Sequence, residues 1–157
     1  GVFVVVAARL LLENLGAVTD RIVLSTGEAD RDANGERLLR SLVGQIEVGI
    51  QQETFGGDER SAEFTSWCRV PRGWIERCRI TLAIDSAESA PVLAATLPNG
   101  DRVVVRRARF ALRLRYLVDA REGGTWFAKW GDGLLAPRAI GVLADSDTVI
   151  VRIGERG

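Results

Sequence analysis

The sequence predicts an α+β fold, in which a helical N-terminal third is followed by antiparallel β-strands. Within residues 1–52, apolar residues recur at the three- and four-residue spacing of an amphipathic helix. From residue 53 onward, short runs of alternating apolar and polar residues are separated by Gly, Pro, Asn and Asp. A helical part followed by a run of strands is typical of an α+β protein, whereas βαβ units alternate strands with helices. We therefore predict one domain, with a helical stem over 1–52 and an antiparallel β part over 53–157.

The chain begins with a strongly apolar segment, Val2 to Leu12, which follows Gly1. This segment is too short to span a bilayer by itself, because a spanning helix needs about 20 apolar residues. It is also too apolar for an ordinary surface helix. An apolar helical stem that leads into a small sheet favours a membrane-tethered or co-assembling module over a free enzyme.

Two apolar stripes predict helical structure in the stem. The first stripe consists of Leu11, Leu15, Val18 and Ile22. These residues fall on one helix face, which we assign to partner binding. The second stripe consists of Leu39, Leu42, Val43, Ile46 and Ile50. The polar stretch between the stripes contains Gly27 and Gly35, and glycine weakens a helix by about 1 kcal/mol relative to Ala. One continuous helix and two helices both fit, and the sequence slightly favours a break between these glycines.

The strands are predicted from alternation and from turn residues. Phe55 to Asp58 is expected to end the helical part, because it contains two consecutive glycines. Strand candidates follow at 62–69, 76–85, 92–97, 102–107, 109–118, 137–143 and 148–153.

Composition excludes several kinds of chemistry. The formal net charge is zero, so the whole chain exerts no long-range attraction on nucleic acid or anionic lipid. The chain contains no His, which removes Ser-His-Asp and Cys-His catalysis and the commonest metal ligand. No Walker A, GxSxG or strand-linked GxGxxG pattern is present. We therefore expect a protein that is not an enzyme and that needs no cofactor or resident metal.

Cys68 and Cys78 flank a turn-like segment that lies between two predicted strands. Symmetric pairing about Gly73 would place the two residues directly opposite each other, and a tighter turn would make them a diagonal pair. We predict a structural disulfide and hence an oxidising compartment. Two buried free thiols are the main alternative. Redox chemistry is disfavoured because the pair lacks CxxC-like spacing and an activating base.

The segment from Arg107 to Val118 alternates strongly. Its apolar side chains are expected on one face and its arginines on the other. The two sets are Phe110, Leu112, Leu114 and Tyr116, and Arg107, Arg109, Arg113 and Arg115. The arginine face could bind phosphates or nucleic acid. A solvated face that pairs with neighbouring carboxylates is favoured, because the net charge is zero and no aromatics interleave with the arginines.

Paired carboxylates and a tryptophan-containing segment are the remaining candidate sites. The pairs are Asp30 with Asp32 and Asp145 with Asp147, and Asp132 lies between glycines. We interpret them as polar turns, because no fuller set of Ca²⁺ ligands appears. Trp126 and Trp130 could form a ligand platform, but core packing beneath a long loop is favoured.

In order and spacing, these segments resemble the minor pseudopilins of type II secretion systems, most closely the J type. The segments that carry the resemblance are Ala62 to Ser66, Glu76 to Leu82, Phe110 to Asp119, Trp126, Trp130 and Leu135 to Ile140. Each motif is short and degenerate, and together they cover most of the chain. The family starts with a leader peptide and a full transmembrane helix, of which Val2 to Leu12 resembles the last half. The cysteine pair and the Gly27 and Gly35 interruption depart from the family pattern.

The resemblance implies a pilin-like fold, with a long N-terminal helix packed on antiparallel sheets. It implies a structural role at the tip of a periplasmic filament that is anchored in the bacterial inner membrane. The implied partners are other minor pseudopilins, reached through the N-terminal helix, and the membrane, with no nucleic acid. The filament aids the export of folded proteins. Two alternatives remain: a minor pilin of a type IV pilus or DNA-uptake machine, and a periplasmic enzyme or ligand binder that uses the Trp126 and Trp130 segment.

Overall fold

The computed structural model describes residues 17–47, 55–69, 72–87, 90–118 and 124–154, with the backbone alone at 17–29 and 132–134. The chain divides into two compact units, Gly1–Asn34 and Gly35–Gly157. The second unit begins inside the predicted 1–52 stem and contains every described strand. The fold is α+β with antiparallel sheets, as predicted.

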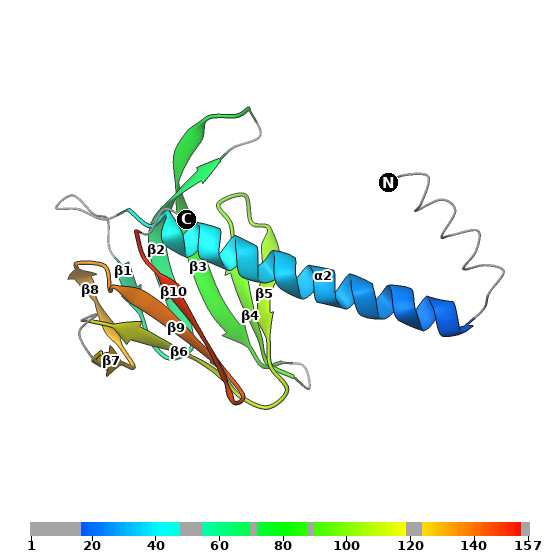
Figure 1. Ribbon diagram of the computed structural model, residues 1–157. Coiled ribbons are helices and arrows are strands. Elements are labelled where there is room, and N and C mark those ends of the chain that lie inside the picture. Colours follow the sequence, from blue (N-terminus) through cyan, green and yellow to red (C-terminus); the bar gives the residue numbers. More distant parts are fainter. Residues whose placement is uncertain (1–16, 48–54, 70–71, 88–89, 119–123, 155–157) are drawn as a thin grey trace. The chain divides into compact units, whose positions relative to one another are not determined.

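Helix α2 (Ala17–Gly44) includes both Gly27 and Gly35, so the break that the sequence slightly favoured between these glycines is absent (Figure 1). Gly35 is buried, and a Cβ atom at this position would lie 3.0 Å from the carbonyl oxygen of Val104 and 3.1 Å from the Cα of Val105. This glycine therefore permits close packing of the helix on strand β5 (Arg102–Arg107). Within the described residues, no helix combines the length and the apolar character that a bilayer crossing requires.

The helix ends at Gly44, earlier than the apolar stripe predicted. Ile46 fits the helical spacing, but it forms an isolated antiparallel bridge with Ser66. The Glu47 N–H donates to the carbonyl of Thr65 at 3.0 Å. The buried Ser66 hydroxyl donates to the carbonyl of Leu42 at 2.6 Å and so satisfies one of the open acceptors at the helix end. The last predicted stripe residue, Ile50, lies outside the described residues.

The larger sheet has six strands in the order β5-β4-β3-β2-β1-β8, and neighbouring strands are antiparallel. The strands are β1 (Phe55–Gly57), β2 (Ser61–Arg69), β3 (Ile75–Asp85), β4 (Val92–Thr96), β5 (Arg102–Arg107) and β8 (Trp130–Leu134). The smaller sheet has the order β10-β9-β6-β7 and is also antiparallel. Its strands are β6 (Leu112–Leu117), β7 (Trp126–Phe127), β9 (Ala139–Ala144) and β10 (Asp147–Arg152).

The predicted strands at 62–69, 76–85, 92–97, 102–107, 137–143 and 148–153 each correspond to an observed strand. The strand predicted over 109–118 begins only at Leu112. Strands β1, β7 and β8 were not predicted. Phe55–Gly57 was expected to end the helical part, but it forms β1 between β2 and β8.

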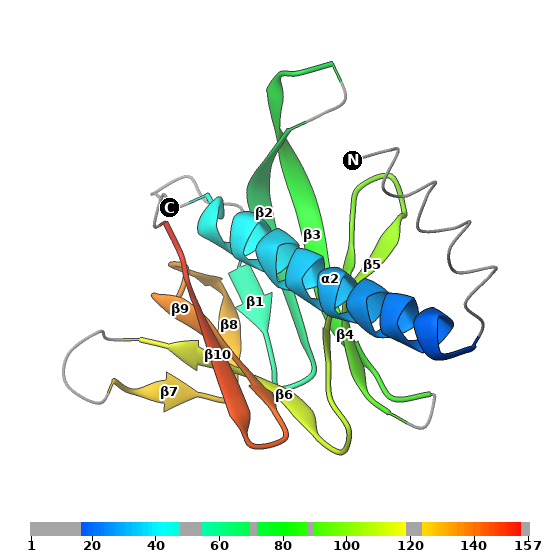
Figure 2. The same cartoon turned by 45° about the vertical axis from the view of Figure 1, so that its right-hand side comes forward.

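The core of the second unit joins both sheets to the end of helix α2. Leu39, Val43 and Ile46 are buried against side chains from both sheets. The end of α2, drawn in cyan, lies against the six-stranded sheet (Figure 2). At the centre, Phe55 stacks on Phe64 with 5.8 Å between ring centroids, and the Tyr116 ring meets Phe55 edge-on at the same centroid distance. These aromatic contacts fix β1, β2 and β6 relative to one another.

Candidate functional site

The partner-binding helix face predicted from the sequence falls mostly outside the described residues. Leu11 and Leu15 lie outside them. The backbone is helical at Val18 and Ile22, whose side chains are not among those described. This face therefore stays a prediction. The second stripe, by contrast, belongs to the core of the second unit, because Leu39 and Val43 are fully buried there.

Cys68 and Cys78 form the predicted disulfide, with a Cα–Cα distance of 5.9 Å. The two cysteines are not directly opposite each other, however, so the prediction of symmetric pairing about Gly73 is wrong. Cys68 lies opposite Glu76, and Cys78 lies opposite Ser66. The bond therefore joins a diagonal pair, which was the alternative. The last strand pair is Arg69 with Ile75, so the turn is centred one residue earlier than Gly73.

A turn between β1 and β2 is held by an acidic side chain. The Asp58 carboxylate accepts the backbone N–H groups of Arg60 at 2.7 Å and Ser61 at 2.9 Å. The hydrogen bond from Arg60 is the main reason that the pKa of Asp58 lies below its usual value, because it favours the charged form. The turn is an Asx turn, which explains the Asp at this position before β2.

Tyr116 connects this turn to the smaller sheet. Its buried hydroxyl lies 2.7 Å from the carbonyl oxygen of Asp58 and 3.0 Å from that of Ser61. Burial raises the pKa of Tyr116 far above its usual value, so the hydroxyl stays protonated and can donate. A Cβ atom at Gly57 would overlap this hydroxyl, which accounts for the glycine. Arg115 forms an ion pair with Glu59 beside the same turn.

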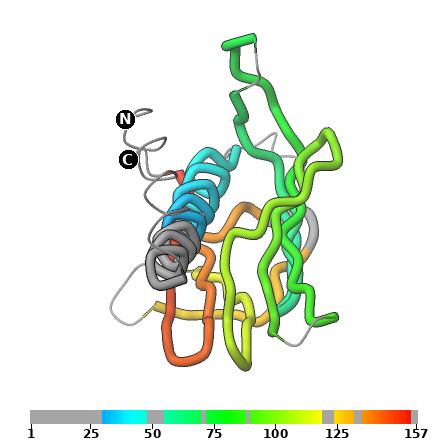
Figure 3. Tube along the Cα trace, turned by 90° about the vertical axis from the view of Figure 1, so that its right-hand side faces the viewer, coloured from blue at the N-terminus to red at the C-terminus, as the bar shows by residue number. Residues whose placement is uncertain are grey.

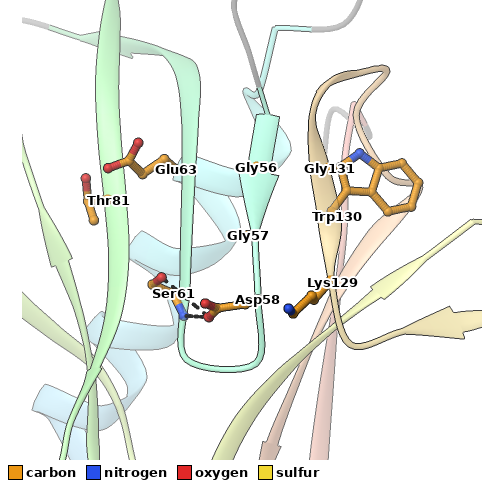
Figure 4. A pocket seen from close by; sticks show the side chains of 9 residues that line it. All are labelled: Gly56, Gly57, Asp58, Ser61, Glu63, Thr81, Lys129, Trp130 and Gly131. Carbon is orange, nitrogen blue, oxygen red and sulfur yellow. Dashed lines mark hydrogen bonds between the residues drawn. The ribbon is translucent and has the colours of Figure 1, made fainter.

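A pocket of about 400 Å³ adjoins the turn (Figure 4). Its polar side chains include Glu63 and Thr81 from neighbouring strands and Lys129 just before β8. Its two carboxylates are already engaged, since Asp58 holds the turn and Glu63 pairs with Arg79 at 3.2 Å. The pocket is lined by Gly56, Gly57, Asp58, Ser61, Glu63, Thr81, Lys129, Trp130 and Gly131. This arrangement provides no paired acid and base, and we assign no reaction to it.

The four arginines predicted to share one strand face are divided among the two sheets and the connection between them. Arg107 ends β5, and Arg109 lies in the connection that follows. Arg113 and Arg115 lie on β6, where Arg115 pairs with Glu59. The prediction of one arginine face is therefore wrong, because the strand begins later than the alternation indicated. The prediction that Leu112, Leu114 and Tyr116 share one face is confirmed, since all three are buried. Phe110, which was placed with them, is 86% exposed.

Asp145 explains the late start of β6. Its carboxylate accepts the backbone N–H groups of Arg109 at 2.8 Å, Phe110 at 2.8 Å and Ala111 at 3.0 Å. These bonds, with that from Arg109 first, lower the pKa of Asp145. Asp145 has a φ of 55°, a conformation that Asp tolerates better than most residues. The interpretation of this residue as part of a polar turn is confirmed.

The other carboxylates are distributed differently from the prediction. Asp30 and Asp32 lie in helix α2 rather than in a turn, and Asp147 begins β10. Asp132 lies in β8, and its side chain is outside the description. Over the part of the chain that the structure describes, no three His, Cys, Asp or Glu side chains gather as metal ligands would.

Both tryptophans of the predicted segment pack against the fold. Trp130 is partly buried against the core, and its indole N–H donates to the carbonyl of Leu135 at 2.7 Å. A Cβ atom at Gly141 would lie 2.9 Å from the Trp126 indole, so that ring covers the smaller sheet. Both indoles are half-buried and lie on strands β7 and β8, so the prediction of core packing holds only in part, for Trp130, which also lines the pocket. The sequence did not predict the hydrogen bond from Tyr116 to the carbonyl of Asp58. The only sequence feature that pointed to this turn was Gly-Gly-Asp.

Comparison with known proteins adds no family assignment. The sequence matches no protein-family model, and no curated protein is significantly similar to it. A functional proposal for this chain therefore draws on its own residues, on the order of its elements and on the resemblance of its motifs.

Proposed function

We propose that the chain is a structural minor pseudopilin of the J type, which acts at the tip of a type II secretion pseudopilus. In this proposal the N-terminal helix anchors the protein in the bacterial inner membrane and binds other minor pseudopilins. The β part lies in the periplasm, and the assembly primes the filament that aids export of folded proteins. The protein has no catalytic role.

The order of the elements supports a pilin-like fold. Helix α2 precedes every described strand, and the strands form antiparallel sheets. The end of the helix contributes Leu39 and Val43 to the core of the β part. The end of the helix is thus part of the sheet domain, as a stem-mediated assembly requires.

The observation that carries the proposal is the division of the helix between two compact units. The boundary falls between Asn34 and Gly35, inside α2. The predicted stripe of Leu11, Leu15, Val18 and Ile22 belongs to the first unit, to which no described strand belongs. An apolar helical stripe needs a partner helix or lipid to remove it from water. This requirement favours an assembly role over a free monomer.

The alternative of a DNA-uptake pilin has less support. In this alternative the four arginines predicted to share one face would bind the DNA, but those arginines lie on different elements. Arg115 is also paired with Glu59. With zero net charge, the chain as a whole exerts no long-range attraction on DNA. The secretion role is therefore the proposal that we retain.

Replacing Leu15 and Val18 with Asp tests the proposal. Two unpaired carboxylates at a helix seam should cost several kcal/mol of association, or about a hundredfold or more in affinity. The measurement is co-purification of the full chain with the pseudopilins encoded in the same gene cluster. The matched control replaces Asn14 and Thr19 with Asp, which adds equal charge off the stripe in the same segment.

The expected result is loss of co-purification in the stripe variant alone, with an unchanged melting temperature of the β part. Normal assembly of the stripe variant would show that this face is not the interface. A large fall in the melting temperature would instead assign the stripe to the core. A gene cluster without pseudopilins would also contradict the proposal.

A further inference from the structure

The outer end of the β2–β3 hairpin exposes three large apolar side chains. Trp67, Trp74 and Ile75 are 41%, 51% and 61% exposed. The hairpin extends beyond its neighbouring strands, as seen in two views (Figures 1 and 3). The strand register agrees, because β4 pairs with β3 only from Thr81 to Asp85. On the other side, β2 is paired as far as Trp67, whose N–H donates to the carbonyl of Gln45 at 2.9 Å. Beyond Trp67 the hairpin end is a projecting two-stranded ribbon, and the three exposed apolar groups at and beyond this point call for an explanation.

The ribbon is held rigid by covalent and polar contacts. A two-stranded hairpin is marginally stable by itself, and the Cys68–Cys78 disulfide fixes this one. The Trp74 indole N–H donates to the Glu76 carboxylate at 2.7 Å, and the Arg72 guanidinium lies 5.8 Å from the Trp74 ring centroid. The exposed aromatics are therefore presented in a defined geometry.

The strand register places apolar and cationic groups together on one face. Trp67 pairs with Arg77, and Arg69 pairs with Ile75, so these four side chains share a face of the ribbon. Arg77 is paired with Glu47 at 2.7 Å. From Ser66 to Arg79 the sequence has four arginines and a single acidic residue, Glu76. Because Arg79 is likewise paired with Glu63 at 3.2 Å, the excess positive charge of the hairpin end rests on Arg69 and Arg72, against the single carboxylate of Glu76.

We propose that this hairpin end docks on the surface of an anionic lipid bilayer. Tryptophan is enriched at membrane–water interfaces, where its ring is apolar and its N–H stays polar. Arginine can bury its aliphatic stem and keep its guanidinium near lipid phosphates. A projecting convex tip suits a deformable bilayer surface, whereas a protein partner would need a matching cavity. Because the chain is neutral overall, the attraction acts only at short range.

The proposal predicts how much the arginines contribute to the binding affinity. An arginine near an anionic surface contributes about fivefold to binding. Replacing Arg69 and Arg72 with Gln should therefore weaken docking of the tip by about 25-fold, if the two contributions add. Both residues are exposed, and neither belongs to the core.

Tryptophan emission provides a readout that the apolar stem cannot mimic. The chain has four tryptophans, at positions 67, 74, 126 and 130, and none in the stem. The full chain is mixed with vesicles of equal parts phosphatidylglycerol and phosphatidylcholine that carry a doxyl quencher near the lipid carbonyls. Docking of the hairpin end should shift the emission to shorter wavelength and quench part of it. Pure phosphatidylcholine vesicles should give much less quenching.

Two variants identify the source of the signal. Replacing Trp67 and Trp74 with Ser should remove the quenched component and leave the emission of Trp126 and Trp130. Replacing Phe110, an exposed aromatic elsewhere, with Ser should change nothing. Unquenched wild-type emission in anionic vesicles would overturn the proposal and favour a protein partner for this tip. Equal quenching in the tryptophan-deleted variant would also overturn it, and the wild-type result can refute the proposal even if a variant misfolds.

Discussion

At the scale of single residues, polar side chains determine how the turns join the sheets. The Asp58 and Asp145 carboxylates each accept backbone N–H groups, and the Tyr116 hydroxyl connects the two sheets. None of these contacts follows from hydrophobic periodicity, which explains why the sequence did not predict them. Phe110 shows the consequence, because the alternation placed it on one face with the now buried Leu112, whereas the Asp145 turn leaves it exposed.

Removing the Tyr116 hydroxyl tests the connection between the sheets. The change Tyr116→Phe keeps the ring and leaves the carbonyls of Asp58 and Ser61 without this donor. We expect the free energy of unfolding to fall by about 1–2 kcal/mol. Denaturant unfolding measures it, with Phe110→Ala as a surface control that should change little. An unchanged midpoint for Tyr116→Phe would contradict the role assigned to the hydroxyl.

The charge of Asp145 gives a prediction for the pH dependence of stability. Its folded-state pKa is lowered from 3.8, so its stabilising contribution is present above the unfolded-state pKa and is lost as the pH falls through the folded value. The variant Asp145→Asn keeps the positive φ accessible but removes the charge. The stability gap between wild type and variant should be constant between about pH 7 and about pH 5, and should close below about pH 4. A gap that widens in acid would contradict this account.

At the scale of elements, alternation located the longer strands and failed for the shortest ones. Strand β1 has three residues, two of them glycine, and β7 has two residues, so neither carries a period. The helix end was misplaced because Ile46 keeps helical spacing while its backbone bridges to β2. These are cases in which tertiary pairing overrides a local pattern.

Gly35 and Gly27 make a matched pair within one helix. Alanine at Gly35 gains helix propensity, but its Cβ would press on the backbone of Val104 and Val105. We expect Gly35→Ala to destabilise the fold by about 1–3 kcal/mol. Gly27→Ala should instead stabilise the helix, by up to about 1 kcal/mol. Circular dichroism and thermal unfolding measure both, and a stabilising Gly35→Ala would refute the close approach.

The disulfide makes a prediction for the hairpin as an element. The cysteines are 10 residues apart, and a cross-link over such a short loop stabilises by about 2–3 kcal/mol. Replacing both Cys68 and Cys78 with Ser should lower stability by this amount, and a reductant should do the same to wild type. Alkylation without reductant, followed by mass spectrometry, should find both thiols blocked. Labelling of both would exclude the bond.

At the scale of the whole molecule, the sequence predicted the α+β class and the helix-then-strand order, because both follow from the spacing of apolar residues. It did not predict the division into a six-stranded and a four-stranded sheet, since strand order depends on contacts far apart in the chain. Of the candidate site residues, the cysteine pair was predictable because two strands flank it. The stripe from Leu11 to Ile22 remains the prediction on which the functional proposal depends.

Photo-crosslinking from position 18 tests that proposal most directly. A photoreactive residue replaces Val18 on the stripe, and in a control protein it replaces Asp20, which lies off the stripe. The full chain is expressed in cells together with the other subunits of its gene cluster. We predict that the probe at position 18 crosslinks to the N-terminal helix of another pseudopilin, and that the probe at position 20 crosslinks far less. Crosslinks from position 18 only to the β part of its own chain would contradict assembly through this helix.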